Sequence, residues 1–541
     1  MPDPVGACAS SVSPRAIDAA LDELGRAGLV CTRLALTARD TICPHPGAEC
    51  DAGECPLARG HFDRIAGAAA ALLEIRRADR GAVEEIAVRH RVCPFALALE
   101  LVPYADVVTG DLNYALDPHV SPKVMQGFRL GSRVALVDEA HNAVDRAREM
   151  FSARLSAREA RGAAAGVADA DPGIAKAARG LAAAIERIAK REIGEGARAA
   201  VLSGAPAGVV RAAERYVAAA EIGLSERPAV RAAAGVFGLY FRALGFLHRA
   251  ERLDDGFAAF VAREGNASVL ELTCVDTAGP MRAALDRVSA AVFFSGTLAP
   301  FDYFSRMLAG GRAGSFVGRS PFPPENLLPL LADRIDTRYA ARGATLDRVV
   351  ELVAAAARAR PGNTLVFFPS YEYLAAASDR LAAVAPEVEL LRQAPGMDEA
   401  ARAEFLALID PAADRSRAAF AVLGGVFGES VDLPDGRISG AIVVTVGLPP
   451  PDPRRETVRA RFDELAGAGF EHAYVYPGAN KVLQAAGRVI RSETDRGFVL
   501  LIDDRLKREP YRTLLGAAWP NPVRISSAAE LSRRLAEFWG S

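Results

Sequence analysis

The stretch RVALVDEAHNAVDRAREM, from Arg133 to Met150, places an apolar run directly before two adjacent carboxylates, Asp138 and Glu139. The apolar run is typical of a buried strand. Open α/β folds place ligand chemistry at the carboxyl ends of parallel strands, where an Asp and a Glu can divide metal binding from proton abstraction. The stretch therefore favours nucleotide hydrolysis, and capping of a helix start by the two carboxylates is the alternative interpretation.

The length and composition set the limits of the problem. A chain of 541 residues with 50% apolar residues predicts two to four domains. The formal net charge of -2 means that a nucleic-acid surface would have to be a local groove. No run approaches the length of a membrane span, and the N-terminus lacks the basic start and long apolar centre of a secretory signal, so we expect a cytoplasmic protein without membrane contact.

Further apolar runs predict the fold class. The segments AAVFFSGTL, NTLVFFPS, AFAVLGGVFGES, GAIVVTVGL and GFVLLIDDR are each followed by a helix-like stretch or a loop. Strands spaced in this way are typical of parallel sheets in an α/β protein. Residues 147–285 are rich in Ala, Arg and Glu with helical spacing, which predicts a mostly helical insertion and not a second sheet.

The cysteines suggest a metal site. Seven cysteines in a long chain without a secretory signal argue against a disulfide framework. Four of them can close one site, namely Cys43, Cys50, Cys55 and Cys93, and all of these except Cys50 precede a proline. An iron–sulfur cluster is favoured over structural zinc because tight CxxC pairs are absent; four ordinary packed thiols are the remaining alternative. We expect packed thiols at Cys8, Cys31 and Cys274.

The stretch LQAAGRVIRSETDRGFVLLIDDR suggests a phosphate-binding face. Gln484, Arg488 and Arg491 recur at intervals of three to four residues, which predicts that they share one helix face. Two guanidiniums on that face would clamp phosphates. A solvated basic helix is the alternative, but Gly487 and the strand that follows favour an ordered site.

These segments together resemble the XPD/DinG branch of superfamily 2 DNA helicases, specifically its bacterial Rad-three-related members. VDEAH resembles motif II, FFSGTLAPFDYF motif III, TLVFFPSYEYL motif IV, GGVFGESVDLPDG motif V and QAAGRVIRS motif VI, in the correct order. TARDTICPHPGAECDAGECPLARGHFDR and the later VCPFALALELVPYADVVTGDLNYALDP resemble the family's iron–sulfur region. The resemblance covers nearly the whole chain.

The resemblance implies an α/β fold with two RecA-like parallel-sheet motor domains. The first would be incomplete and interrupted by the iron–sulfur region and by a helical Arch insertion. The implied boundaries are 1–105 for the iron–sulfur region with a remnant of motor domain 1, 106–146 for the DEAH part of that domain, 147–285 for the Arch, 286–320 for its return, and 321–541 for motor domain 2.

The resemblance also implies site residues. Asp138 and Glu139 would serve Mg²⁺ and the attacking water of ATP, and His141 would couple the nucleotide to DNA. Motif VI would contribute Gln484, with Arg488 and Arg491 at the γ-phosphate. The relay between nucleotide and DNA would be Ser295, Gly296 and Thr297, and the residues at the cleft would be Gly428, Glu429 and Asp432. A 4Fe–4S cluster would be bound by Cys43, Cys50, Cys55 and Cys93.

The implied function is ATP-dependent movement on single-stranded or forked DNA, in the 5′ to 3′ direction, by a monomer in DNA repair or replication. Phosphate and stacking contacts would hold the strand without sequence preference. The sequence departs from the family in one respect, because it contains no G-x-x-x-x-G-K-[ST] phosphate loop. We therefore expect the N-terminal part of motor domain 1 to be absent, and exposed apolar edges at residues 135–137 and the neighbouring strands.

Three functional classes follow from this departure. An ATP-driven DNA helicase explains the five motifs and is favoured. A nucleotide-independent iron–sulfur protein that binds DNA explains the missing lysine. A structural zinc protein explains the cysteines alone.

Overall fold

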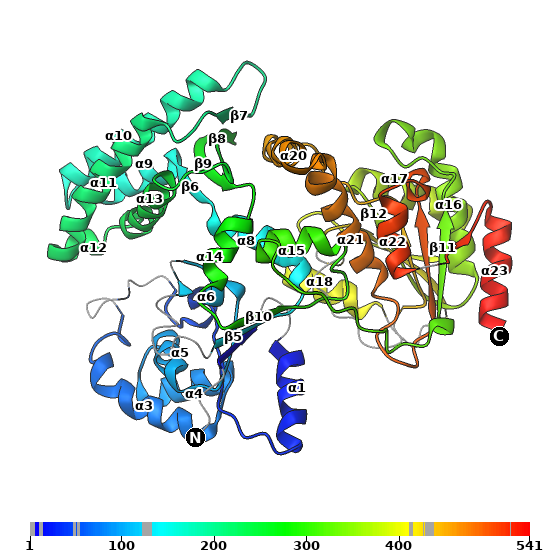
Figure 1. The fold of residues 1–541 in the computed structure, drawn as a ribbon, viewed down its shortest axis with the longest axis horizontal. Coiled ribbons are helices and arrows are strands. Elements are labelled where there is room, and N and C mark those ends of the chain that lie inside the picture. The colour runs from blue at the N-terminus through cyan, green and yellow to red at the C-terminus, as the bar shows by residue number, and fades with distance from the viewer. Residues whose placement is uncertain are drawn as a thin grey trace. The chain divides into compact units, whose positions relative to one another are not determined.

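The chain forms two structural units (Figure 1). The computed structural model describes residues 6–9, 14–46, 50, 55–118, 120–121, 133–409, 415–425, 427, 438–519 and 521–540. Unit 1 comprises Met1–Gly296 with Phe304–Ala313, and unit 2 comprises Thr297–Tyr303 with Gly314–Ser541. Each unit contains one parallel sheet, so the predicted α/β class is confirmed. Within the described ranges, no helix combines the length and apolar character needed to cross a membrane.

The acid-bearing stretch forms β5 (Arg133–Val137) in the sheet of unit 1. This sheet has six strands in the order β10-β5-β1-β4-β2-β3, and all pairs are parallel. The other five strands are β10 (Ala290–Phe293), β1 (Gly6–Ala9), β4 (Val107–Thr109), β2 (Arg33–Ala35) and β3 (Arg77–Ala78). Val134 of β5 lies opposite both Ala7 and Ala290, so β5 is paired on both sides.

The exposed apolar edge lies on β10 and not on β5. Ala135 and Val137 are each 1% exposed, because β1 and β10 cover both sides of their strand. The expectation of an exposed edge at residues 135–137 is therefore wrong. Among the described residues β10 forms the end of the sheet, where Val292 is 50% exposed and the following Phe294 is 43% exposed.

The cysteine-bearing segment packs as helices against this sheet. Leu34 of β2 and Val108 of β4 share an apolar core with residues of three helices, α3 (His61–Ile75), α4 (Arg80–His90) and α5 (Pro94–Leu101). The side chain of Asp79 accepts a hydrogen bond from the Ala82 amide at 3.0 Å and so caps α4. The other helices of this part are α1 (Pro14–Arg26), α2 (Arg39–Ile42), α6 (Leu112–Leu116) and α8 (Ala143–Phe151).

The insertion after α8 combines helices with a sheet of its own. Its four strands pair antiparallel in the order β6-β9-β8-β7, so the prediction that this insertion has no second sheet is wrong. The strands are β6 (Ala153–Ser156), β7 (Ala199–Leu202), β8 (Phe257–Glu264) and β9 (Ala267–Cys274). The helices of unit 1 that follow α8 are α9 (Ala157–Gly166), α10 (Pro172–Glu192), α11 (Ala207–Glu226), α12 (Pro228–Arg231), α13 (Val236–Ala250) and α14 (Ala278–Leu285). Alanine, the strongest helix former, occupies adjacent positions in β7 and in β8, which is why composition favoured helices.

The sheet of unit 2 has seven strands in the order β13-β14-β12-β15-β16-β11-β17, and its pairs are parallel. Its strands are β11 (Leu327–Ala332), β12 (Gly362–Phe368), β13 (Glu389–Arg392), β14 (Ser416–Val422), β15 (Gly440–Val443), β16 (Gly497–Ile502) and β17 (Val523–Arg524). The apolar runs NTLVFFPS, AFAVLGGVFGES, GAIVVTVGL and GFVLLIDDR supply β12, β14, β15 and β16. The prediction of parallel strands from these runs is confirmed.

Helices cover both faces of this second sheet. Val366 and Phe368 of β12 point into one apolar core, and Leu365 and Phe367 into the other, as the alternation of a strand requires. The first core includes residues of α16 (Arg342–Arg358), α17 (Tyr371–Val384) and α23 (Ala528–Gly540). The second includes residues of α18 (Glu399–Ala407), α21 (Tyr476–Ala486) and α22 (Tyr511–Ala518). Two further helices are α15 (Phe301–Ala309) and α20 (Pro453–Ala466).

We expect Gly440→Ala to destabilise the protein. A Cβ at Gly440 would lie 2.2 Å from the ring of Phe498, a side chain that is 1% exposed. Overpacking of this kind lowers the free energy of unfolding by about 1–3 kcal/mol, which urea denaturation measures. The control is Gly343→Ala in α16, where a Cβ meets nothing within 4 Å. An unchanged urea midpoint for Gly440→Ala would show that the Phe498 ring moves aside at no cost.

Candidate functional site

The two carboxylates that follow β5 lie in a strained turn. Glu139 has a φ of 46°, in the left-handed region that residues other than glycine rarely adopt. The Asp138 carboxylate accepts a hydrogen bond from the Glu139 amide at 2.7 Å. Strained residues of this kind concentrate at functional sites, because the surrounding structure holds them against their own preference.

Glu139, His141 and Ser295 form one polar cluster. His141 Nδ1 lies 2.6 Å from Ser295 Oγ and 3.2 Å from Glu139 Oε2. Ser295 Oγ in turn lies 3.5 Å from the same carboxylate oxygen. Burial lowers the pKa of His141 to about 4, so the imidazole is neutral at pH 7. The contact with Glu139 is therefore not an ion pair, and Ser295, which is hydrogen-bonded to both side chains, links the neutral ring to the carboxylate.

Backbone hydrogen bonds bring this cluster together. The Phe294 amide donates to the Val137 carbonyl at 3.0 Å, and the Ala140 amide donates to the Phe294 carbonyl at 3.1 Å. These bonds extend the pairing of β5 and β10 beyond the ends of both strands. They place Ser295, which follows β10, beside the side chains that follow β5. Gly296 and Thr297 continue the chain into the connection with unit 2.

The cluster has the groups for metal-assisted hydrolysis. Carboxylate oxygens are the ligands that Mg²⁺ prefers in proteins, and Asp138 offers them at the carboxyl edge of a parallel sheet. Glu139 is a carboxylate beside a neutral imidazole, which suits it to accept a proton from water. The structure thus brings Asp138, Glu139, His141 and Ser295 together, and their catalytic roles stay predictions.

The predicted arginine face on one helix is wrong. Helix α21 ends at Ala486, so Gln484 lies within it while Arg488 and Arg491 lie beyond its end. Gly487 is the C-cap, and its position ends the helical spacing. The carboxylate of Asp495 accepts hydrogen bonds from the amides of Arg491 and Ser492, each at 2.8 Å, and holds this loop in place.

Gln484 and Arg488 are nevertheless held in ordered surroundings. Arg488 is 7% exposed, which excludes the alternative of a solvated basic helix for this side chain. The Oε1 atom of Gln484 is buried and has no hydrogen-bond partner among the described residues. A buried acceptor in that state is suited to a donor from a ligand or a water molecule. The cleft residues Gly428, Glu429 and Asp432 lie outside the described residues.

Lys481 was missed by the sequence analysis. Its side chain packs over the backbone of Gly424. If residue 424 had a side chain, its Cβ would lie 2.8 Å from the Nζ atom of Lys481. Gly424 follows β14 and has a φ of +75°, so a side chain there would be strained as well as crowded. The signal was present in the sequence, because Lys481 precedes Gln484 by one helical turn.

Two of the four candidate metal-binding cysteines lie at the ends of helices. Cys43 is the C-cap of α2, and Cys93 is the N-cap of α5, where the proline that follows occupies the first helical turn. Burial raises the pKa of the Cys93 thiol. Hydrogen bonds from backbone amides lower this pKa in part, and the neighbouring thiols of Cys43 and Cys50 raise it. Within the described ranges no three His, Cys, Asp or Glu side chains are grouped closely enough to hold one metal ion. The cluster therefore stays a prediction.

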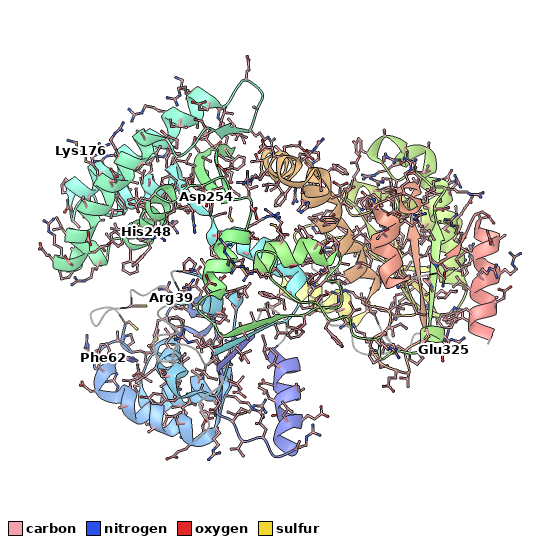
Figure 2. The ribbon with its side chains drawn as sticks, viewed as in Figure 1. Arg39, Phe62, Lys176, His248, Asp254 and Glu325 are labelled. Atoms are coloured by element: carbon pink, nitrogen blue, oxygen red, sulfur yellow. The ribbon has the colours of Figure 1, made fainter. Side chains whose placement is uncertain are left out.

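Two more residues border the cysteines and were not predicted. Arg39, labelled in Figure 2, places Nη1 at 4.0 Å from Cys50 Sγ. His61 Nδ1 accepts a hydrogen bond from the Cys93 amide at 3.4 Å, and this histidine is 7% exposed. Its neighbour Phe62, also labelled in Figure 2, is 88% exposed.

Two family models match the chain. Residues 30–160 match the DEAD_2 family, and residues 353–522 match the helicase C-terminal domain, Helicase_C_2. The first match includes Glu139 and His141 with the four cysteines Cys43, Cys50, Cys55 and Cys93, and the second includes Lys481 and Arg488. Ser295 lies outside both matches. The matches therefore fall on the two units separately.

Curated relatives include helicase subunits of DNA repair. The XPD subunit of general transcription and DNA repair factor IIH from Dictyostelium discoideum is 22% identical over 525 residues, covering 80% of this chain and 66% of the relative. The regulator of telomere elongation helicase 1 homolog from Anopheles gambiae is 33% identical over 186 residues, covering 31% of this chain and 18% of the relative. The chain thus spans less than two thirds of the length of these relatives.

Solved structures show the same fold. A structure titled XPD_Helicase matches with a TM-score of 0.62 at 15% identity, covering 97% of this chain and 92% of that one. The structure of S. tokodaii Xpd4 matches with a TM-score of 0.59 at 14% identity, covering 97% and 91%. At these identities the likeness concerns the fold alone.

Acid should destabilise the protein partly through His141. Its folded-state pKa of about 4 lies below the ordinary histidine pKa of 6.5, so the unfolded chain binds the proton more tightly. Stability from this group is present above pH 6.5 and is lost as the pH falls toward 4. Between pH 7 and pH 5 the wild type should lose about 2 kcal/mol more unfolding free energy than His141→Gln, by urea denaturation at each pH. His248→Gln, a change at an exposed histidine labelled in Figure 2, should behave like the wild type. Equal losses in His141→Gln and the wild type would contradict the assignment.

Proposed function

Because the chain belongs to the XPD-like family of superfamily 2 helicases, which combines the DEAD_2 and helicase C-terminal domains, we propose that it is an ATP-dependent helicase or translocase on single-stranded DNA. The members of this family are ATP-dependent DNA helicases. The observation that carries the proposal is the cluster of Glu139, His141 and Ser295 beside Asp138, at the carboxyl edge of a parallel sheet. A role in DNA repair or replication, a 5′ to 3′ direction and action as a monomer on forked DNA belong to the same proposal.

Each member of the cluster has a role in this proposal. Asp138 holds Mg²⁺, which neutralises charge on the phosphates when it is bound. Glu139 orients the attacking water and accepts its proton. His141, neutral because it is buried, transmits the position of Glu139 to Ser295 and so to the chain that leaves β10. The roles of Gln484, Arg488 and Arg491 stay predictions, as do those of Gly428, Glu429 and Asp432.

A second candidate function is a nucleotide-independent protein that binds DNA and carries an iron–sulfur cluster. The observation that favours it is the absence of G-x-x-x-x-G-K-[ST] from all 541 residues. That loop supplies the amides and the lysine that grip the β- and γ-phosphates. In both candidates DNA binding is expected to ignore sequence and to weaken steeply as salt rises.

ATP turnover separates the two candidates. We expect slow release of phosphate with Mg²⁺ and saturating single-stranded DNA, because losing the phosphate loop costs several orders of magnitude, on the order of 4 kcal/mol or more. The remaining turnover should rise with DNA and vanish in Glu139→Gln. The matched control is Glu149→Gln, a change of the same kind on α8, which should leave turnover unchanged.

Other outcomes are equally informative. Turnover that is no higher than in Glu139→Gln, with DNA binding intact, would reject the helicase and select the second candidate. Turnover of 1–100 per second, about the range of kinases, would contradict the slow rate and reveal another phosphate-binding loop.

The cluster proposal predicts iron. We propose that Cys43, Cys50, Cys55 and Cys93 bind a 4Fe–4S cluster, supported by the Cys93 thiol at the N-terminus of α5. Protein purified without oxygen should contain about four irons per chain, and Cys93→Ser should lose most of them. The control Cys31→Ser should keep its iron. Stoichiometric zinc without iron, or full iron in Cys93→Ser, would contradict the assignment.

A further inference from the structure

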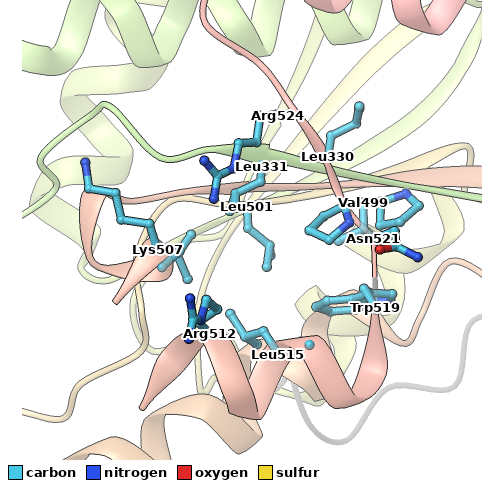
Figure 3. Close-up of a pocket in the computed structure, with 14 residues that line it drawn as sticks. Leu330, Leu331, Val499, Leu501, Lys507, Arg512, Leu515, Trp519, Asn521 and Arg524 are labelled. Atoms are coloured by element: carbon cyan, nitrogen blue, oxygen red, sulfur yellow. The ribbon is translucent and has the colours of Figure 1, made fainter. Parts of the chain in front are cut away.

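A cavity of about 340 Å³ lies in unit 2 beside helix α22, against one face of the sheet (Figure 3). It contains none of the residues assigned above to ATP, DNA or metal. Its volume is in the range of small-molecule sites, which begin at roughly 300 Å³.

The floor of the cavity is an apolar patch on the sheet. In the register of β11 and β16, Pro329 lies opposite Val499 and Leu331 lies opposite Leu501. Residues two apart on a strand share a face, so these four side chains form one patch on the sheet. Leu515 and Trp519, which line the cavity from α22 and the residue after it, lie across from this floor (Figure 3).

The charged side chains that line the cavity are all cations. Lys507, Arg512 and Arg524 line it, and none of its lining residues among those described is an Asp or a Glu. Figure 3 shows the three cations at one end of the cavity, with Trp519 and Asn521 at the other. A ligand in this cavity would therefore meet positive charge at one end and an indole at the other.

The cations are oriented but keep donors for a ligand. Arg512 pairs with Glu509 through Nε at 2.8 Å and Nη2 at 2.7 Å, and Arg524 Nε lies 3.6 Å from an Asp333 carboxylate oxygen. The side chains of Arg512 and Arg524 are 68% and 69% exposed. Lys507 Nζ donates to the Asp333 carbonyl at 3.2 Å. A guanidinium carries five N–H donors, more than these contacts use.

We propose that this cavity binds a small organic anion with a flat apolar body, of the class of aromatic carboxylates and aromatic phosphate esters. The body would lie between the indole of Trp519 and the apolar floor, where burial of apolar surface and ring contacts favour binding. The anionic group would lie at the end formed by the three cations, where charge-assisted hydrogen bonds hold carboxylates and phosphates.

The chain offers a selective reporter for the test. It has two tryptophans, Trp519 in the cavity and Trp539 on α23, where the guanidinium of Arg360 stacks on the ring at 4.6 Å. Protein labelled with 5-fluorotryptophan should show two ¹⁹F resonances, assigned with Trp539→Phe. Titration with 2-naphthoate should shift the Trp519 resonance to saturation and leave that of Trp539 in place. The neutral 2-naphthamide should bind at least tenfold more weakly.

Two variants with matched controls locate the site. A Cβ at Gly516 meets nothing within 4 Å, so the side chain of Gly516→Leu can enter the cavity without a clash at its Cβ atom. This variant should abolish the shift of the Trp519 resonance. The control Gly343→Leu, at a helical glycine that is equally open, should keep the shift. Arg512→Gln should weaken naphthoate binding about tenfold, the effect of one charge-assisted hydrogen bond, and the exposed Arg508→Gln should not.

Three results would overturn the proposal. The first is a naphthoate titration that shifts neither resonance or shifts both alike. The second is equal affinity for naphthamide, which would exclude the anionic end. The third is undiminished binding in Gly516→Leu.

Discussion

The pairing of β5 with β10 beyond their ends is the constraint on which the candidate site depends. Two backbone hydrogen bonds, from Phe294 to Val137 and from Ala140 to Phe294, hold the loops after these strands together. Because backbone bonds set the spacing, His141 and Ser295 meet at 2.6 Å although they are 154 residues apart in the chain. The strained backbone of Glu139 is maintained by the same bonds, since the residue after it donates one of them.

Burial then decides the chemistry of this cluster. A charged imidazole beside Glu139 would neutralise the carboxylate and compete with any metal ion or water for it. Because burial keeps His141 neutral near pH 7, the ring acts on Glu139 through the hydrogen bonds of Ser295 and leaves the negative charge of the carboxylate in place. A neutral ring also transmits movement without a change of charge, which suits a coupling role better than an acid–base role.

The sequence predicted the parts of the fold that rest on local patterns. Apolar runs followed by polar turns predicted β5, β12 and β16, because strands buried on both faces are apolar throughout. It failed where long-range pairing decides, because β8 and β9 form a sheet by pairing with each other and with β7 and β6. It also failed at the end of α21, where Gly487 ends the helix before Arg488. In the site, Asp138, Glu139 and His141 were predictable from one motif. The contacts of Lys481 with Gly424, and of His61 with Cys93, follow from tertiary packing and were not.

Strand β10 has the apolar composition of an internal strand, although it lies at the edge of the described sheet. AAVF is typical of an internal parallel strand, yet among the described residues β10 is at the edge and Val292 is 50% exposed. Parallel sheets are ordinarily covered, and an exposed apolar edge is a template for pairing. Any strand paired in parallel with β10 would end level with Ser295. The loop after that strand would then be separated from Glu139, which follows β5, by the width of β10 alone. That is the same edge at which a phosphate loop has to present its amides to nucleotide bound by Asp138 and Glu139. Among the described residues, the free side of β10 is thus the place where a strand leading into a phosphate loop would pair.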